Sequence, residues 1–239
     1  MSATDVASIA ATAPAEKHPT IRPVDAATLI LIDRSRRAPR VLMGRRSPKL
    51  KFMPGKLVFP GGRVDPEDRR MPVYGMLESE TERRLLAGVV RPSSARSRAL
   101  ALAAIRETFE ETGLMLGTKE AGAPEGVPAG WTAFAEAGVF PNLEALTLVA
   151  RAITPPGRTR RFDARFFMAE ASGLLTPEPT AGSGELDEIA WMPLSEARTL
   201  ELPAITRMVL GEAAERRADP GRIPPFVRFV RGVHLITRD

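Results

Sequence analysis

Cysteine is absent from this chain of 239 residues, and histidine occurs only twice. Without cysteine the protein has no disulfide, no cysteine-ligated zinc and no thiol nucleophile. The two histidines, His18 and His234, lie at opposite ends of the sequence, so a Ser-His-Asp triad or a multi-histidine metal site would depend on one of two poorly placed residues. Any hydrolytic chemistry is therefore expected to use carboxylates or a metal ion.

Long hydrophobic runs are also missing. No uncharged apolar stretch approaches the roughly 18 residues that a membrane-spanning helix needs, so no membrane partner is expected. Residues 1–24 begin MSATDVASIAATAPAEKHPT, which lacks the basic start of a secretory signal and carries Asp5 near its beginning. We expect this segment to be a flexible tail and the protein to be cytoplasmic.

Charge and composition limit the classes of ligand and the number of domains that are expected. Lysine and arginine number 34 against 29 aspartates and glutamates, which gives a net charge of +5 and a pI near 10.2. Such an excess favours an anionic ligand, such as a nucleotide, a nucleic acid or a phosphate ester, although it also serves solubility. With 44% hydrophobic and 26% charged residues, the segment 25–239 is expected to form a single domain with its own core.

Short β-prone apolar runs bounded by turn residues predict a series of strands. The charged turn DRSRRAPR joins the first two runs into an expected hairpin, and the last run is expected to be the final strand of the chain. The predicted strands cover residues 26–32, 41–43, 57–59, 146–153, 162–169 and 189–192.

Helical patterns are interleaved with these runs. Residues 99–112 (ALALAAIRETFEET) predict the clearest helix, because they contain no glycine or proline and are followed by Gly113, a natural C-terminal cap. Segment 91–98 is expected to be a break before it, and a terminal helix is expected within 195–217. Since no regular βα repeat is present, an α/β domain with a mixed sheet is favoured over a doubly wound parallel one.

Three carboxylates share one face of the predicted helix. Glu107, Glu110 and Glu111 stand at positions i, i+3 and i+4, where like charges repel unless a cation lies against them. Clustered carboxylate oxygens suit Mg²⁺ or Mn²⁺, which keep waters and substrate phosphate oxygens as further ligands. Taken alone, such a string is more typical of a solvated acidic face.

A Gly-Gly turn at Gly61 and Gly62 lies upstream of this helix and is followed by acidic residues. Turn and helix together resemble the Nudix box, whose pattern is Gly, five residues, Glu, seven residues, then Arg-Glu-U-x-Glu-Glu-x-Gly-U, where U is aliphatic. In the helix the match comprises Arg106, Glu107, Glu110, Glu111, Gly113 and Leu114, with Thr108 at the first aliphatic position.

The first half of the box departs from the pattern. Counting five residues from Gly62 reaches Asp68 instead of a glutamate, and 37 residues rather than seven separate Asp68 from Arg106. The box therefore resembles one that is split by an insertion at 69–97. Because the cost of closing a loop grows slowly with its length, the two halves can still meet in space.

A second resemblance, to the members of this family that cleave coenzyme A, precedes the turn. Their segment reads roughly Leu-Leu-Thr-x-Arg-Ser, three residues, Arg, three residues, Gly, three residues, Phe-Pro-Gly-Gly. Lys51 stands where the pattern has arginine, so the bidentate fork is lost. The residues in register are Leu42, Met43, Gly44, Arg45, Arg46, Ser47, Lys51, Gly55 and Phe59 to Gly62.

The resemblance, which extends over residues 25–210, implies a Nudix-like mixed sheet sandwiched between helices and a metal-dependent diphosphatase. The substrate that the resemblance favours most is coenzyme A or acyl-coenzyme A, and a nucleotide sugar or a dinucleotide is the alternative. From a different class, a catalytically silent module that binds nucleotide or nucleic acid is the competing hypothesis, although a nucleic-acid partner is not expected. The oligomeric state is left open.

The resemblance also implies roles for individual residues. Mg²⁺ or Mn²⁺ would be held by Glu107, Glu110 and Glu111, with Arg106 orienting these carboxylates, and the substrate would be bound by Arg46, Lys51, Gly61 and Gly62. The proton acceptor is left open between the helix glutamates and three later acids, Glu185, Asp187 and Glu188. A second basic group that could bind an anionic substrate comprises Arg158, Arg160, Arg161 and Arg165.

Overall fold

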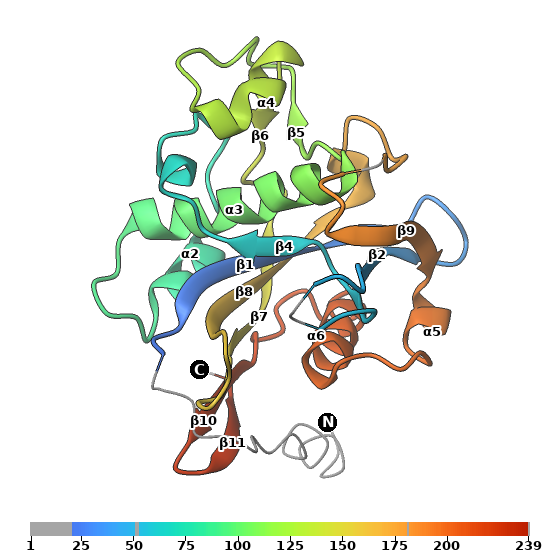
Figure 1. Ribbon diagram of the computed structural model, residues 1–239. Coiled ribbons are helices and arrows are strands. Elements are labelled where there is room, and N and C mark those ends of the chain that lie inside the picture. Colours follow the sequence, from blue (N-terminus) through green and yellow to red (C-terminus); the bar gives the residue numbers. More distant parts are fainter. Residues whose placement is uncertain (1–20, 51–52, 181, 239) are drawn as a thin grey trace.

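A computed structural model describes residues 21–50, 53–180 and 182–238, and its elements are labelled in Figure 1. The strands are β1 (Val24–Asp33), β2 (Arg40–Arg46), β3 (Leu57–Val58), β4 (Gly61–Arg63), β5 (Gly117–Thr118), β6 (Phe140–Pro141), β7 (Thr147–Ile153), β8 (Phe162–Glu170), β9 (Leu186–Pro193), β10 (Phe226–Val230) and β11 (Val233–Thr237). The helices are α2 (Ser79–Leu86), α3 (Ser94–Thr112), α4 (Thr132–Glu136), α5 (Leu194–Ala197) and α6 (Ala204–Glu215), with 3₁₀ turns at Pro66–Arg69, Ala129–Trp131 and Ala171–Gly173.

Most of the strands form one mixed sheet. Its order is β11-β10-β7-β8-β1-β2-β3, with β4 paired to β1 and β9 paired to β2. The central strand β1 runs parallel to β8, and antiparallel to both β2 and β4. At the far side β10 runs parallel to β7. This is the mixed α/β arrangement expected from the sequence.

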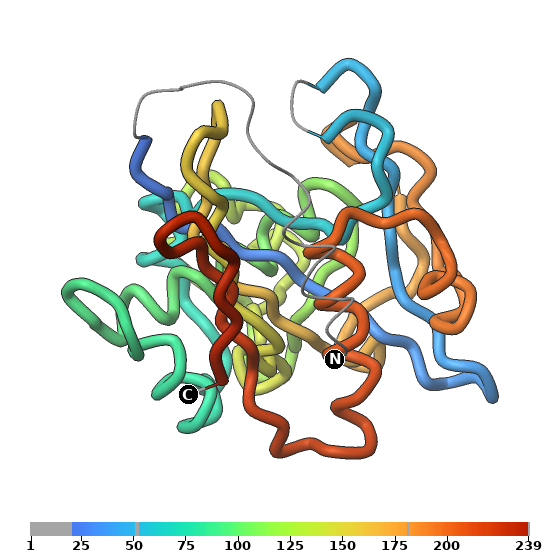
Figure 2. The backbone as a smooth tube through the Cα atoms, turned by 90° about the horizontal axis from the view of Figure 1, so that it is seen from below, coloured from blue at the N-terminus to red at the C-terminus, as the bar shows by residue number. Residues whose placement is uncertain are grey.

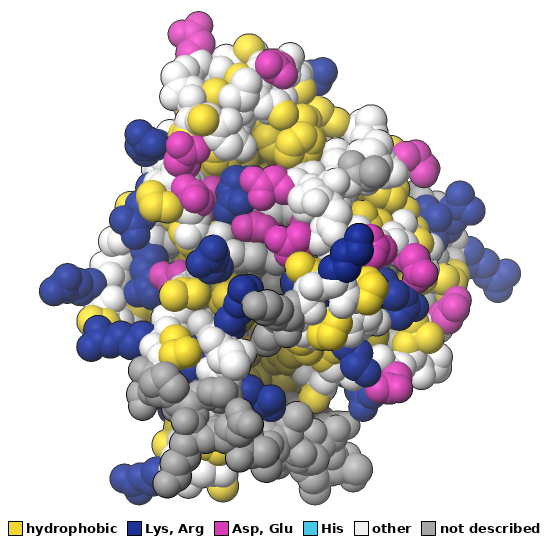
Figure 3. Space-filling view, viewed as in Figure 1, with side chains coloured by type: hydrophobic (Ala, Val, Ile, Leu, Met, Phe, Trp, Pro, Cys, Tyr) yellow, Lys and Arg dark blue, Asp and Glu magenta, His cyan; other side chains and the backbone are white. Residues whose placement is uncertain are grey.

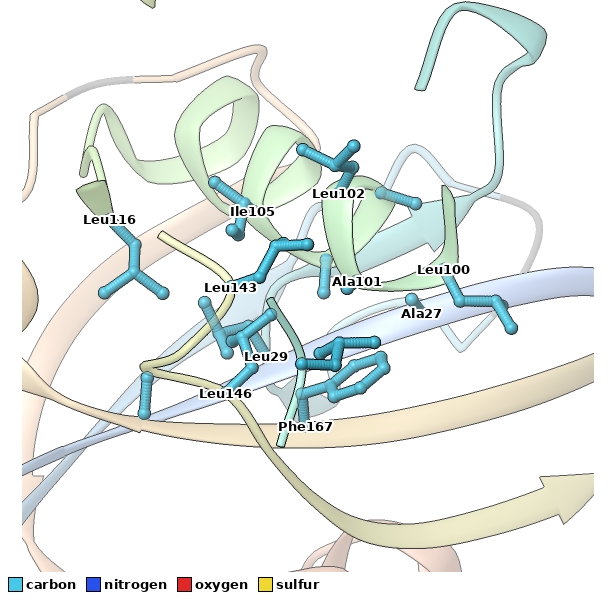
Figure 4. Close-up of a cluster of buried hydrophobic side chains, with 14 of the residues drawn as sticks. Ala27, Leu29, Leu100, Ala101, Leu102, Ile105, Leu116, Leu143, Leu146 and Phe167 are labelled. Carbon is cyan, nitrogen blue, oxygen red and sulfur yellow. The ribbon is translucent and has the colours of Figure 1, made fainter. Parts of the chain in front are cut away.

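The two faces of β1 are buried in different cores. Leu29 and Leu31 lie on one face, in the hydrophobic cluster that α3 shares with Phe167 of β8, as Figure 4 shows for Leu29 and Phe167. Ile30 and Ile32 lie on the other face, in the cluster that includes α6. Each fully buried leucine or isoleucine contributes roughly 1.5–3 kcal/mol, so this continuous apolar strand anchors helices on both sides of the sheet.

A small layer covers α3 on the side away from the sheet (Figure 1). It contains the two-stranded β5–β6 sheet and α4. Trp131 and Phe134 are buried there, and the ring of Phe134 meets those of Trp131 and Phe109 edge to face. The middle of helix α3 is therefore enclosed from both sides, and charged side chains reach the surface only near its two ends.

Several element boundaries differ from the sequence predictions. The break expected at 91–98 is wrong for residues 94–98, which belong to α3. The helix begins at Ser94 because the side chain of Ser93 caps it, accepting a hydrogen bond from the backbone N–H of Arg96. The strand ending at Pro193 is not the last, since β10 and β11 follow it. The terminal helix is divided into α5 and α6 by the segment 198–203, which contains Pro203.

No helix in the described ranges is long and apolar enough to cross a bilayer. Figure 2 shows the hairpin β10–β11, the loop between β7 and β8, and the start of β1 on the same side of the molecule. The acidic end of α3 lies away from that side, next to β4 and to the loop that precedes β9 (Figure 1).

Candidate active site

The final turns of α3 carry the charged side chains that the sequence predicted to act together. The helix ends where Gly113 takes a left-handed conformation with φ of 73°, which glycine adopts without a steric penalty. Figure 3 shows acidic side chains gathered on this face, over α3 and β4. Glu111 is 3% exposed, whereas the side chain of Glu110 is 41% exposed.

The Gly-Gly turn approaches this helix so closely that a larger residue at its second position would displace the carboxylate of Glu107. A Cβ at Gly62 would collide with the carboxylate of Glu107. The backbone N–H of Gly61 donates a hydrogen bond of 2.9 Å to Oε2 of Glu111. Strand β4 is held in place by pairing with Ala27 and Thr28 of β1, so the sheet itself fixes this contact. The predicted meeting of turn and helix is thereby observed.

Arg106 joins the two segments through its whole guanidinium. Its Nε and Nη2 donate to the carboxylate of Asp68 at 2.8 and 3.2 Å, and Nη2 also donates to the carbonyl of Arg63. Its Nη1 donates to Glu107 and Glu110, both at 3.0 Å. Burial by itself would lower the pKa of Arg106, but the surrounding carboxylates raise it well above its usual value. The arginine therefore stays charged and fixes three acidic side chains.

Two of the glutamates are costly to ionise in the absence of a cation. Burial raises the pKa of Glu107 to about 7, Arg106 opposes this shift, and repulsion from Glu110 and, to a smaller extent, Glu185 adds to it. Burial also raises the pKa of Glu111 to about 8, and repulsion from Glu107 and Glu185 adds to this shift, while the hydrogen bond from Gly61 opposes it. Strongly perturbed carboxylates that converge in this way are typical of functional sites.

The loop before β9 brings one further acid to the cluster. The backbone N–H groups of Thr180 and Ser183 donate to the last carbonyls of α3, those of Thr112 and Glu110, at 2.8 and 2.7 Å. Glu185 follows directly, and its negative charge contributes to the raised pKa of both Glu107 and Glu111. No pattern in the sequence distinguished this residue from Asp187 and Glu188, because the distinction depends on how the loop caps the helix.

The basic residues predicted to bind substrate are only partly brought together. Nη2 of Arg46 lies 3.5 Å from Oε2 of Glu185, which places this arginine beside the acidic cluster. Arg45 instead pairs with Glu188 at 2.6 Å. Lys51 falls outside the described residues. The second basic group, from Arg158 to Arg165, lies where β7 ends and β8 begins, near the opposite end of α3 from the glutamates.

Within the described ranges, no three acidic or histidine side chains form a ready-made metal cage. Arg106 occupies one oxygen of Glu107, and the N–H of Gly61 occupies one oxygen of Glu111. The donor set nonetheless fits a hard divalent cation, because Mg²⁺ commonly takes one or two carboxylates and completes its shell with water and phosphate oxygens. The metal-binding roles of Glu107, Glu110 and Glu111 stay predictions.

The raised pKa values predict how stability depends on pH without divalent cations. In the unfolded chain both glutamates have a pKa of about 4.5, whereas in the folded protein the pKa is about 7 for Glu107 and about 8 for Glu111. Between these limits the folded protein binds more protons than the unfolded chain. Stability should therefore fall as the pH rises from about 5 to about 8. With EDTA present, we expect the melting temperature at pH 8.5 to lie clearly below that at pH 6, because each kcal/mol of lost stability lowers it by roughly 2–4 °C.

The double variant Glu107→Gln/Glu111→Gln should lose most of this pH dependence, because neither amide titrates. Adding Mg²⁺ to the unmodified protein should raise its melting temperature more at pH 8.5 than at pH 6, since both carboxylates are ionised there. An unmodified protein in EDTA whose melting temperature is the same at both pH values would contradict the raised pKa values.

No protein-family model matches this sequence, and neither does any curated protein. Among solved structures, the fold is similar to that of a NUDIX hydrolase from Alicyclobacillus acidocaldarius, with 28% identity and a TM-score of 0.59 over 81% of this chain and 91% of that one. It is also similar to the NUDIX domain of Shewanella oneidensis NrtR complexed with ADP ribose (12% identity, TM-score 0.49, 91% and 99% covered) and to a C. elegans Ap4A hydrolase (16%, 0.44, 82% and 98%).

Proposed function

We propose, from the premise that this chain has the fold of the Nudix hydrolase superfamily, that it hydrolyses the phosphoanhydride bond of a nucleoside diphosphate linked to another moiety. The single observation that carries the proposal is a pair of converging carboxylates, the half-buried Glu107 and the buried Glu111, held against the Gly-Gly turn. Because the pKa values of both carboxylates are raised, ionising them without a further cation destabilises the fold, which favours a functional reason for their position.

The residues have distinct roles in this reaction. Glu107 and Glu111, with the more exposed Glu110, would hold Mg²⁺ or Mn²⁺, which when bound polarises the phosphoanhydride and lowers the pKa of a water molecule. Arg106 keeps the carboxylates of Glu107 and Glu110 in place through Nη1. Glu185 would accept the water's proton on its carboxylate, because its negative charge contributes to the raised pKa of both Glu107 and Glu111.

The Nudix box of this protein is, in our proposal, interrupted by the insertion at 69–97. Asp68 replaces the glutamate of the first half and pairs with Arg106 across 37 intervening residues. The intervening segment includes α2, which packs beside the first half of α3. Its presence lengthens the connection while leaving the contact between Asp68 and Arg106 intact, as the slow growth of closure cost with loop length allows.

For the substrate, we propose coenzyme A or an acyl-coenzyme A, on the spacing of the segment from Leu42 to Lys51. Arg46 lies beside Glu185 and is placed to meet a phosphate at the acidic cluster.

A substrate screen with Mg²⁺ or Mn²⁺ tests this function. Coenzyme A, ADP-ribose, a nucleotide sugar and a diadenosine polyphosphate are incubated with the protein, and the release of nucleoside monophosphate or other phosphorylated products is measured with and without EDTA. We expect turnover of coenzyme A or its thioesters to be fastest and to stop when the cation is removed. Metal-dependent turnover of another member alone would reject the coenzyme A assignment. Turnover of none would reject the enzymatic function and favour a silent binding module.

A further inference from the structure

Three segments that are far apart in the sequence meet at the end of the sheet opposite the acidic cluster. The backbone N–H of Val24 donates to the carbonyl of Arg161, and the guanidinium of Arg161 donates to the carbonyl of Ile21. The hairpin β10–β11 projects in the same direction, because β10 runs parallel to β7 from Phe226 onward. Figures 1 and 2 both show the hairpin, the loop between β7 and β8, and the start of β1 on one side. We call residues 21–24, 154–162 and 226–237 the basic end.

The basic end holds the whole positive excess of the chain. Its members carry none of the chain's 29 acidic residues and six of its 34 basic ones, so the rest of the chain carries 28 basic against 29 acidic residues. The arginines are Arg22, Arg158, Arg160, Arg161, Arg228 and Arg231. A charge excess confined to one surface produces a directional field, which a charge spread evenly for solubility would lack.

Among the described residues, the two acids that adjoin this surface in the sequence are paired with other arginines. Asp25, the residue after Val24, is held by Arg96 at 2.7 Å, and Asp163 is held by Arg151 at 2.8 Å. The buried Arg165 contacts both of these aspartates. The acids next to the basic end are thus already engaged by arginines that do not belong to it.

Exposed aliphatic side chains gather at the same place. Of the nine large hydrophobic residues exposed in the described ranges, five belong to the basic end, and Val233 at the tip of the hairpin is 62% exposed. The five are Ile21, Val24, Val230, Val233 and Leu235. No tryptophan, tyrosine or phenylalanine is among the nine.

We propose that the basic end docks onto the surface of an anionic lipid bilayer. Arginines next to exposed aliphatic side chains match such a surface, where the charges meet lipid headgroups and the apolar side chains enter the headgroup boundary. Nucleic acid fits this surface less well, because its phosphates gain nothing from exposed valine and leucine and its bases are bound by aromatic stacking. The docking is peripheral and differs from membrane spanning.

The position of the basic end leaves the acidic cluster accessible during docking. Arg96, which holds Asp25 beside the basic end, and Glu111 are separated by fifteen residues of α3. At 1.5 Å per residue this corresponds to roughly 22 Å along the helix axis. A bilayer touching the hairpin tip would therefore lie far from the last turns of α3, and docking does not depend on the proposed hydrolysis.

Cosedimentation of the full chain with lipid vesicles tests the proposal. We expect binding to phosphatidylcholine vesicles that contain phosphatidylglycerol, weak binding to pure phosphatidylcholine, and release as the ionic strength rises. The double variant Arg160→Glu/Arg231→Glu should lower the partition coefficient by about 25-fold or more, at roughly fivefold for each arginine removed near an anionic leaflet. The matched control Arg36→Glu/Arg37→Glu makes the same charge change in the exposed turn after β1 and should alter binding less than about twofold.

The apolar contribution is tested separately and distinguishes lipid from nucleic acid. Val233→Ser keeps the charge and should weaken vesicle binding several-fold, whereas Val90→Ser, at a position 85% exposed elsewhere, should leave it unchanged. Unchanged melting temperatures would show that each variant is folded. The proposal is overturned if the protein does not bind anionic vesicles, or if Arg36→Glu/Arg37→Glu lowers the partition coefficient as much as Arg160→Glu/Arg231→Glu. It is also overturned if duplex DNA or RNA binds tightly while Val233→Ser does not affect vesicle binding.

Discussion

Replacing Glu111 by glutamine is expected to abolish most of the activity and to stabilise the protein that lacks a cation. Removing one charged electrostatic contact from a water-poor site typically costs on the order of 10² to 10³ in kcat, and we expect a loss of at least about that size. Stability should change in the opposite direction, because the carboxylate is 3% exposed and burial raises its pKa to about 8. Steady-state kinetics with Mg²⁺ and thermal melting in EDTA at pH 8.5 measure the two effects.

Two further glutamine variants serve as comparisons for the activity and stability of Glu111→Gln. Glu110→Gln should lose less activity, because its side chain is 41% exposed and already paired with Arg106. Glu136→Gln, which makes the same chemical change at an exposed position on α4, should alter neither kcat nor stability. If Glu111→Gln kept full metal-dependent turnover, the assignment of this residue to the cation would be wrong, whatever the substrate.

Removing the carboxylate of Asp68 is expected to destabilise the protein by about 3 kcal/mol, because breaking a buried ion pair leaves its partner charge uncompensated. Asp68 is fully buried and holds Arg106 at 2.8 Å through Nε, and its Oδ2 also accepts a hydrogen bond from the backbone N–H of Asp65. Without Asp68, the guanidinium of Arg106 would shift toward Glu107 and Glu110. The turnover of Asp68→Ala should therefore fall together with its stability, as measured by chemical denaturation and kinetics.

An exposed ion pair provides the contrast for Asp68→Ala. Glu80 of α2 pairs with Arg83 at 2.7 Å and also with Arg84, and its side chain is 45% exposed. Glu80→Ala should therefore destabilise the protein much less than Asp68→Ala and leave kcat unchanged. Asp68→Glu, which keeps a carboxylate at this position, should retain more activity than Asp68→Ala. Equal losses of stability for Asp68→Ala and Glu80→Ala would show that the contact with Arg106 carries no special weight.

The sequence predicted best those features that depend on neighbouring residues. The helix pattern, its end at Gly113 and the common face of Glu107 and Glu111 all follow from local spacing, and the structure contains each of them. The N-terminal boundary of α3 was predicted less well, because the capping hydrogen bond accepted by Ser93 outweighed the polar composition of the first turn. The final hairpin β10–β11 was missed, since its apolar pattern is short and its partner strand β7 lies more than seventy residues earlier.

What the sequence by itself determined is the local chemistry: three carboxylates on one helix face, a glycine turn able to approach them, and an excess of arginine without cysteine. Only the tertiary structure decided which distant groups meet. It brought Asp68 to Arg106 across 37 residues, placed the charge of Glu185 where it raises the pKa of Glu111, and left the arginines after β7 far from the glutamates. The reason is that pairing across a sheet and the capping of a helix by a remote loop depend on the whole fold, which no short stretch of sequence encodes.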